Sequence, residues 1–230
     1  MREPTPRLIV FDCDGTLVDS GHIIVDTMTL VWQGAGLVPP TPDQIRHQIG
    51  TSLDHAIGAL HPDGDPEILQ QLTLACRKAF VSDRAAGKYE EPLYESCSGV
   101  LEALSGVDHY VLGVATGKGR RGLNHTLQRH GIAHHFSILK TSEDGPGKPH
   151  PEILINAMAE MGVSPWQTVV IGDTIFDVTM AVRAGAKAIG VSWGYHAPEM
   201  LTDAGASVVA NHFTELPVDI DLHSLGFILL

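Results

Sequence analysis

The chain has 230 residues, of which 43% are hydrophobic, enough for one large domain or for a core domain with a smaller insert. Its 27 acidic and 15 basic side chains give a net charge of −12, which excludes the basic surface expected of a protein that binds nucleic acid or an anionic membrane. The three cysteines are widely spaced, which argues against a disulfide framework and favours a cytoplasmic protein. The N-terminus shows no apolar signal core, and no apolar run has the length of a membrane helix.

The first predicted strand is the apolar run Leu8–Phe11. No good strand follows between Asp19 and Glu91, where stripes of apolar residues over 24–35 and 68–79 have helical spacing instead. Within this stretch, Thr41 to Gln44 form the pattern of a capped helix start, with proline at the first helical position. We therefore expect a helical cap domain over residues 19–91, inserted into a core domain made of residues 1–18 and 92–230.

Beyond the insert, apolar runs alternate with helical segments, each of which is followed by a glycine that ends it. Short continuous apolar runs of this kind are typical of strands buried on both faces of a parallel sheet. The alternation predicts an α/β fold with a doubly wound, Rossmann-like parallel sheet. The expected strands are Tyr110–Ala115, Thr168–Ile171, Ala188–Trp193 and Ser207–Ala210, and the expected helices are Arg120–His130, Pro151–Met161 and Asp177–Ala184.

The chain ends in the apolar sequence "LGFILL", residues 225–230, which is too short to span a membrane. We expect it to dock on the core, with a contact between copies of the chain as the alternative. The protein is accordingly expected to be a monomer or a homodimer.

Ligands of open parallel sheets bind beyond the carboxyl ends of the strands. If the predicted strands are neighbours, four carboxylates, one hydroxyl and one ammonium group converge on one crevice. They are Asp12 and Asp14 after the first strand, Thr116 after the second, Asp173 and Asp177 after Thr168–Ile171, and Lys148 in the loop "GPGKPHP".

Four aspartates at one site raise each other's pKa, so they require compensating positive charge. A divalent cation together with Lys148 would supply it, and ligands that are all oxygen atoms favour Mg²⁺. The histidine pair at 134 and 135 is interpreted as a surface or loop feature rather than as part of a zinc site.

Several motifs occur in a fixed order along the chain: "DCDGT", "ATGK", "GKPHP", "GDTIFDV" and, further on, "AGAKAIGVSWGY". In this order, and with the helical insert after the first strand, the sequence resembles the haloacid dehalogenase superfamily over nearly its whole length. More narrowly, it is similar to the capped phosphatases of the phosphoglycolate phosphatase type. The resemblance implies a Mg²⁺-dependent phosphatase that acts on a small phosphorylated metabolite.

The resemblance also implies roles for individual residues. Asp12 would be the nucleophile that forms an aspartyl-phosphate, and Asp14 would be the general acid and then the general base. An acid/base at this position speaks against dehalogenase activity. Thr116, Lys148 and the backbone amide of Gly117 would hold the phosphoryl oxygens.

The implied metal ligands are Asp12, Asp173 and the backbone carbonyl of Asp14, with Asp177 in a supporting role. Arg46, in the part of the insert expected to select the leaving group, is the candidate contact for a second anionic group of the substrate, with surface exposure as its alternative. Lys118 is interpreted as a surface charge.

Other activities remain open at the level of the sequence. A sugar-phosphate mutase, a pyrophosphatase or a nucleotidase could use the same aspartyl-phosphate chemistry. A more remote alternative is a non-catalytic binding protein with this fold, because a fold does not determine a function.

Overall fold

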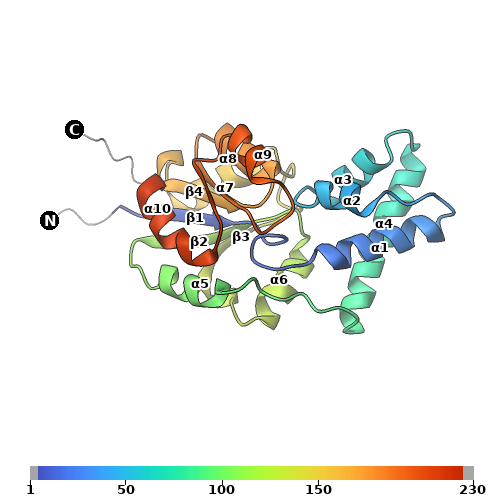
Figure 1. Ribbon diagram of the computed structural model, residues 1–230, viewed down its shortest axis with the longest axis horizontal. Helices are drawn as coiled ribbons and strands as arrows, with labels where there is room; N and C mark the ends of the chain where they lie inside the picture. The colour runs from blue at the N-terminus through green and yellow to red at the C-terminus, as the bar shows by residue number, and fades with distance from the viewer. Residues whose placement is uncertain (1–4, 225–230) are drawn as a thin grey trace.

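The computed structural model describes residues 5–224, and in it six parallel strands form one sheet in the order β3-β2-β1-β4-β5-β6 (Figure 1). This order confirms the predicted doubly wound α/β fold. It also places β1 and β4 side by side at the centre, where the strand order changes direction. Strands β2 and β3 lie on one side of this pair, and β5 and β6 lie on the other. The strands are β1 (Arg7–Phe11), β2 (Tyr110–Ala115), β3 (Phe136–Lys140), β4 (Thr168–Gly172), β5 (Lys187–Val191) and β6 (Val208–Ala210).

The sheet is apolar on both faces because its successive side chains alternate between two hydrophobic cores. In β1, Ile9 and Phe11 pack into one core, whereas Leu8 and Val10 pack into the other. The first core is covered by α5 (Cys97–Ser105), α6 (Arg120–Arg129) and α10 (Leu216–Ser224). The second is covered by α7 (Glu152–Met161), α8 (Ile175–Arg183) and α9 (Pro198–Ala204).

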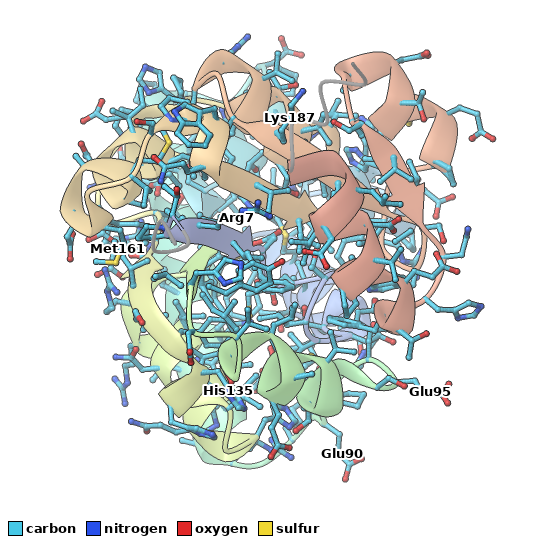
Figure 2. All side chains as sticks on the ribbon, turned by 90° about the vertical axis from the view of Figure 1, so that its left-hand side faces the viewer. Arg7, Glu90, Glu95, His135, Met161 and Lys187 are labelled. Atoms are coloured by element: carbon cyan, nitrogen blue, oxygen red, sulfur yellow. The ribbon has the colours of Figure 1, made fainter. Side chains whose placement is uncertain are left out.

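Figure 2, in which Arg7 marks the start of β1, shows these helices on both sides of the sheet. Acidic side chains such as Glu90 and Glu95 extend outward from the molecule, as expected for its negative net charge. Short 3₁₀ turns occupy three of the connections: Ala133–His135, Pro165–Gln167 and Phe213–Glu215.

Strand β3 was not among the predicted strands, and its position explains why. It lies at the edge of the sheet, and within its sequence "FSILK" only Ile138 is fully buried. An edge strand with polar residues at two of its five positions lacks the continuous apolar run that identifies the central strands.

The segment between β1 and α5 forms α1 (Gly21–Gly34), α2 (Pro42–Gln48), α3 (Leu53–Leu60) and α4 (Pro66–Ala85), which lie to one side of the sheet (Figure 1). We call these four the helical group. The predicted cap of α2 is present, since the Thr41 hydroxyl accepts a hydrogen bond from the Gln44 amide. The group has a separate core, and the division into residues 19–91 and the rest of the chain stays a prediction. Its buried residues are Val25, Met28, Trp32, Ile45, Ile57, Leu72 and Cys76.

The chain crosses between the sheet and the helical group twice, and the two crossings are hydrogen-bonded to each other. The Asp19 amide donates to the carbonyl of Pro92 (2.9 Å), and the Tyr94 amide donates to the carbonyl of Leu17 (3.1 Å). Between them, Val18 and Leu93 form an antiparallel bridge. The helical group is thus attached at one place, just beyond the carboxyl end of β1.

Two expectations concern membranes and the C-terminus. Within residues 5–224, no helix combines the length and the apolar character needed to cross a bilayer. The apolar sequence at 225–230, which we expected to dock on the core or on a second copy, lies outside the described residues.

Candidate active site

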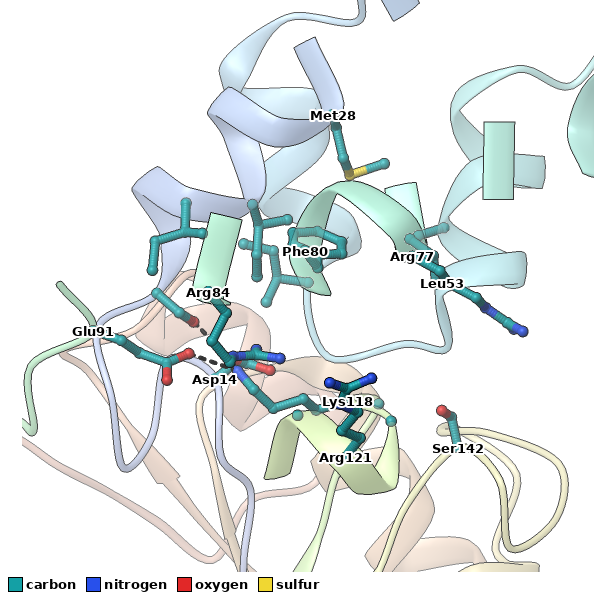
Figure 3. A pocket seen from close by; sticks show the side chains of 18 of the residues that line it. Asp14, Met28, Leu53, Arg77, Phe80, Arg84, Glu91, Lys118, Arg121 and Ser142 are labelled. Atoms are coloured by element: carbon teal, nitrogen blue, oxygen red, sulfur yellow. Dashed lines mark hydrogen bonds and ion pairs between the residues drawn. The ribbon is translucent and has the colours of Figure 1, made fainter. Parts of the chain in front are cut away.

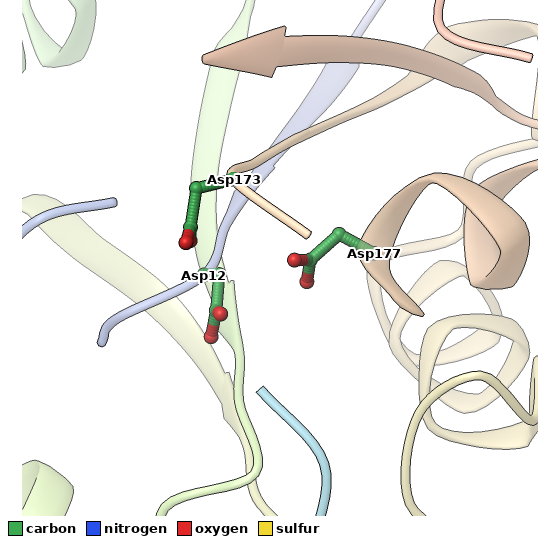
Figure 4. A group of neighbouring side chains, drawn as sticks. All are labelled: Asp12, Asp173 and Asp177. Carbon is green, nitrogen blue, oxygen red and sulfur yellow. The ribbon is translucent and has the colours of Figure 1, made fainter. Parts of the chain in front are cut away.

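The central strands bring three of the predicted carboxylates together beyond their carboxyl ends (Figure 4). Asp12 directly follows β1, Asp173 directly follows the neighbouring β4, and Asp177 lies in the first turn of α8. One oxygen atom from each of the three lies within 4.8 Å of the others, and all three side chains are buried. The structure therefore brings three of the four predicted carboxylates into one buried cluster, and Asp14 is not among them.

Asp12 is fully buried, and its two carboxylate oxygens have different surroundings. Oδ1 lies 2.8 Å from Lys148 Nζ and accepts a hydrogen bond from the Cys13 amide (2.6 Å), whereas Oδ2 has no hydrogen-bond partner among the residues that the structure describes. Burial raises the pKa of Asp12 to about 7, against the opposing attraction of Lys148. A buried, unpaired carboxylate oxygen requires an explanation, and a bound ligand or a reactive role provides one.

Lys148 is the cation in ion-pair contact with this cluster in the described part of the chain. Its ammonium group bridges Asp12 (2.8 Å) and Asp177 (2.7 Å), and its side chain is completely buried. Burial alone would lower the pKa of Lys148, but the two carboxylates outweigh it, so its pKa lies above the ordinary value. Lys148 therefore remains charged.

The other two carboxylates are held by local hydrogen bonds. Asp173 accepts from the Thr16 hydroxyl (2.8 Å) and from the Tyr195 amide (2.9 Å), and Asp177 accepts from the Thr174 hydroxyl (2.7 Å). Burial, and then the neighbouring carboxylates, raise the pKa of Asp173 well above its ordinary value. Three buried carboxylates balanced by one ammonium group form an oxygen-only donor set that fits a divalent cation.

Asp14 is not part of this cluster and has different hydrogen-bond partners. Its Oδ1 accepts hydrogen bonds from the Ser20 hydroxyl and the Lys118 ammonium group, both at 2.6 Å. Burial raises the pKa of Asp14, but Lys118 and Ser20 outweigh it, so that the pKa is lower than usual. Asp14 therefore differs from Asp12 and Asp173, whose pKa values are raised, and it lies outside the cluster of three aspartates.

The prediction that Lys118 is a surface charge is wrong. Only 11% of its side chain is exposed, and its ammonium group also pairs with the buried Glu91 at 2.7 Å. Glu91 in turn accepts a hydrogen bond from the Thr126 hydroxyl (2.6 Å). Sequence reasoning missed this network, because Glu91 and Lys118 meet only through the tertiary fold.

Thr116 and Gly117 lie at the carboxyl end of β2, as predicted. The Thr116 hydroxyl accepts a hydrogen bond from the Lys118 amide (3.2 Å). Gly117 lies beneath the loop between α2 and α3 so closely that an added Cβ would be 2.1 Å from the carbonyl oxygen of Thr51. A loop of the helical group therefore contacts Gly117, one of the residues predicted to hold the phosphoryl oxygens.

Arg46 is not brought to these residues. Its side chain is 45% exposed and pairs with Asp43 on the same helix at 3.0 Å. It also does not line the cavity of about 390 Å³ that opens between the helical group and α6. That cavity borders the site at Asp14, Gly117 and Lys118 (Figure 3).

Residues 9–191 match the family of haloacid dehalogenase-like hydrolases. The chain belongs to this family. The predicted superfamily is thereby confirmed, and the match includes the acidic crevice, Lys148 and the whole helical group.

Individual proteins are similar to this hydrolase over most of its length. A probable phosphatase, IndB, from Dickeya dadantii (strain 3937) is 31% identical over 212 residues, which cover 91% of each chain. A phosphoglycolate phosphatase from Vibrio vulnificus (strain YJ016) is 27% identical over 94% of this chain and 96% of its own. A crystal structure of a predicted phosphoglycolate phosphatase from Haemophilus somnus 129pt has the same fold, with a TM-score of 0.82 and 22% identity over 94% of this chain and 99% of that one.

Proposed function

We propose that this hydrolase is a Mg²⁺-dependent phosphatase that cleaves a small phosphate monoester through an aspartyl-phosphate on Asp12. The observation that carries the proposal is the unpaired, buried Oδ2 of Asp12 within a cluster of three carboxylates and one ammonium group. The names of the two curated relatives, a probable phosphatase and a phosphoglycolate phosphatase, support it.

In the first half-reaction, Asp12 Oδ2 attacks phosphorus, and the bond from phosphorus to the leaving oxygen breaks. Asp14 borders the cavity through which the leaving group would depart, and it would protonate the leaving oxygen. This role requires the negative charge of the bound phosphoryl group to raise the pKa of Asp14 from the lowered value that Lys118 and Ser20 give it in the free protein. In the second half-reaction, water attacks the phosphorus of the aspartyl-phosphate and Asp14 accepts its proton. Hydrolysis releases phosphate and restores Asp12.

Lys148, Thr116 and the Gly117 amide would hold the phosphoryl oxygens, and Asp177 would position Lys148 through their 2.7 Å contact. The carboxylates of Asp12 and Asp173 and the backbone carbonyl of Asp14 would hold Mg²⁺. When bound, the ion would offset the negative charge of the aspartates and of the phosphoryl group. Asp12 and Asp173 belong to the buried, oxygen-only cluster described above, and that cluster fits such an ion.

The first experiment measures phosphate release from a panel of esters that includes phosphoglycolate, sugar phosphates, nucleotides and pyrophosphate, each with and without Mg²⁺. We expect release that depends on Mg²⁺, stops on chelation and returns when the ion is added again. An isomerised sugar phosphate without free phosphate would replace the proposal with a mutase. Absence of turnover on every compound would contradict it and favour the binding protein.

The close contact of the helical group with Gly117 makes a further prediction. In Gly117→Ala, the added methyl group would overlap the carbonyl oxygen of Thr51, so the loop above the site must retreat. We expect kcat/KM to fall by on the order of 10²-fold, because small displacements at a reacting centre are costly. Gly119→Ala is the matched control, since its Cβ would meet only the end of the Glu143 side chain. Equal activity of the two variants would show that the site works without this contact.

A further inference from the structure

The cavity beside Asp14 has an apolar wall that the proposed chemistry does not require. All four members of the helical group contribute to this wall, and Figure 3 shows Met28, Leu53 and Phe80 among the side chains that line the cavity. Such a wall favours a ligand with an apolar body, because each square ångström of apolar surface removed from water contributes to binding. Its main members are Ile23, Ile24, Met28, Ile45, Leu53 and Phe80.

Four arginines line the cavity: Arg77, Arg84, Arg121 and Arg129. Arg129 donates a hydrogen bond to the carbonyl of Tyr89, whereas Arg84 and Arg121 come from opposite sides of the cavity. Arg84 comes from the end of α4, and Arg121 comes from the first turn of α6 (Figure 3). The guanidinium group of Arg84 reaches across to α6, where its terminal nitrogens lie 3.4 and 3.5 Å from the position that a Cβ on Gly122 would occupy. Gly122 and Arg121 both line the cavity, so the Arg84 guanidinium lies beside the turn of α6 that carries Arg121.

Neither arginine is part of an ion pair within residues 5–224. Arg77, which also lines the cavity, differs in this respect, because it pairs with Asp54 at 2.7 Å. Arg84 and Arg121 therefore leave two guanidinium groups available to an anion. Guanidinium groups bind carboxylate and phosphate oxygens with paired, charge-assisted hydrogen bonds.

Each acidic side chain that lines the cavity already has another partner, and none forms an ion pair with Arg84 or Arg121. Asp14 and Glu91 share Lys118, Asp83 pairs with Lys88 (3.2 Å), and Glu143 accepts from the Arg120 amide (2.9 Å). Burial lowers the pKa of the nearby His125, and Arg84 is the charged group that lowers it most, while Glu91 opposes this effect.

We propose that the leaving group of the substrate has an apolar body and a second anionic group, and that the anion binds between Arg84 and Arg121. This inference rests on the phosphatase function proposed above. It also favours a leaving group larger than glycolate, because a two-carbon group offers an anion but leaves the apolar wall of the 390 Å³ cavity without a partner. An aromatic or branched aliphatic ester with a carboxylate or a second phosphate has the required chemistry.

The test compares kcat/KM for 4-carboxyphenyl phosphate and for phenyl phosphate, two esters that differ in one anionic group. We expect the protein to prefer the carboxylated ester about tenfold or more, and Arg84→Gln and Arg121→Gln each to reduce that preference severalfold. Comparing the same two esters in each variant cancels their difference in intrinsic reactivity. Arg77→Gln is the matched control and should retain the preference, because Arg77 is already paired with Asp54.

A preference that is absent, or that survives in both Arg84→Gln and Arg121→Gln, would overturn the inference. Calorimetry with two stable analogues, benzylphosphonate and its 4-carboxylate, separates this failure from a failure of the proposed function. If neither these esters nor any compound of the panel is hydrolysed, the phosphatase proposal fails, while the analogues still test the cavity. Tighter binding of the carboxylated analogue, weakened in the two arginine variants, would support the inference, and equal affinities would refute it.

Discussion

Asp12→Asn is expected to reduce kcat by at least about 10⁴-fold, because an amide cannot replace the carboxylate as the nucleophile. The fold should persist, since asparagine has nearly the same shape and Lys148 retains its contact with Asp177 at 2.7 Å. The measurement is Mg²⁺-dependent phosphate release from the best ester of the panel. Circular dichroism and thermal unfolding then establish that the variant is folded.

A second readout tests the covalent step itself. Acid quenching during turnover of a ³²P-labelled ester should leave label on the protein, and hydroxylamine should release it, as expected for an acyl phosphate. The label should be absent from Asp12→Asn and present in the control Asp26→Asn, which changes an exposed aspartate on α1. Substantial turnover or retained label in Asp12→Asn would rule out Asp12 as the nucleophile.

Lys148→Met is expected to have the largest effect on stability. It removes the one ammonium group that pairs with Asp12 and Asp177, leaving two buried carboxylates without a cation. Breaking a buried ion pair in this way costs about 3–5 kcal/mol of unfolding free energy. Urea unfolding, with divalent cations removed, measures the loss. The control is Lys140→Met, which breaks the pair with the exposed Glu160 and should cost less than about 1 kcal/mol.

The loss in Lys148→Met should depend on pH. Burial already raises the pKa of Asp12 to about 7 in the native protein, and removal of Lys148 would raise it further. A carboxyl group with a higher pKa in the folded state binds its proton more tightly there, so it destabilises the fold as pH rises. We expect a larger loss at pH 8 than at pH 5.5. The same loss at both values would show that the pairing with Lys148 is not its cause.

The parts of the fold that could be predicted are those with a strong local pattern. The central strands β1, β2 and β4 appear in the sequence as apolar runs because both of their faces are buried. Thr41 and Gln44 predict the start of α2 because they form a capping pattern. Strand β3 could not be identified in this way, because an edge strand with one fully buried residue has no such run.

The same distinction applies to the site. Asp12 and Asp173 could be placed together because each directly follows a strand, and the carboxyl ends of parallel strands meet at one edge. The contacts of Lys118 join residues 104 and 27 positions apart, and no periodicity predicts them. Arg46 was chosen for its charge and its segment, whereas the unpaired cations of the cavity come from α4 and α6. Charge alone did not reveal which face of a helix borders the cavity.

The paired crossings at Leu17–Asp19 and Pro92–Tyr94 have a consequence for how this protein could change. Since the chain leaves and re-enters the sheet at neighbouring points, a segment of different length or shape could replace residues 19–91 without displacing β1 or α5. Asp12, Lys148 and Asp173 would keep their positions, while much of the surface that meets the leaving group would be exchanged. The choice of substrate can therefore evolve, or be engineered, without moving these three residues, provided that the new segment again supplies the contacts that Ser20, Thr51 and Glu91 make with Asp14, Gly117 and Lys118.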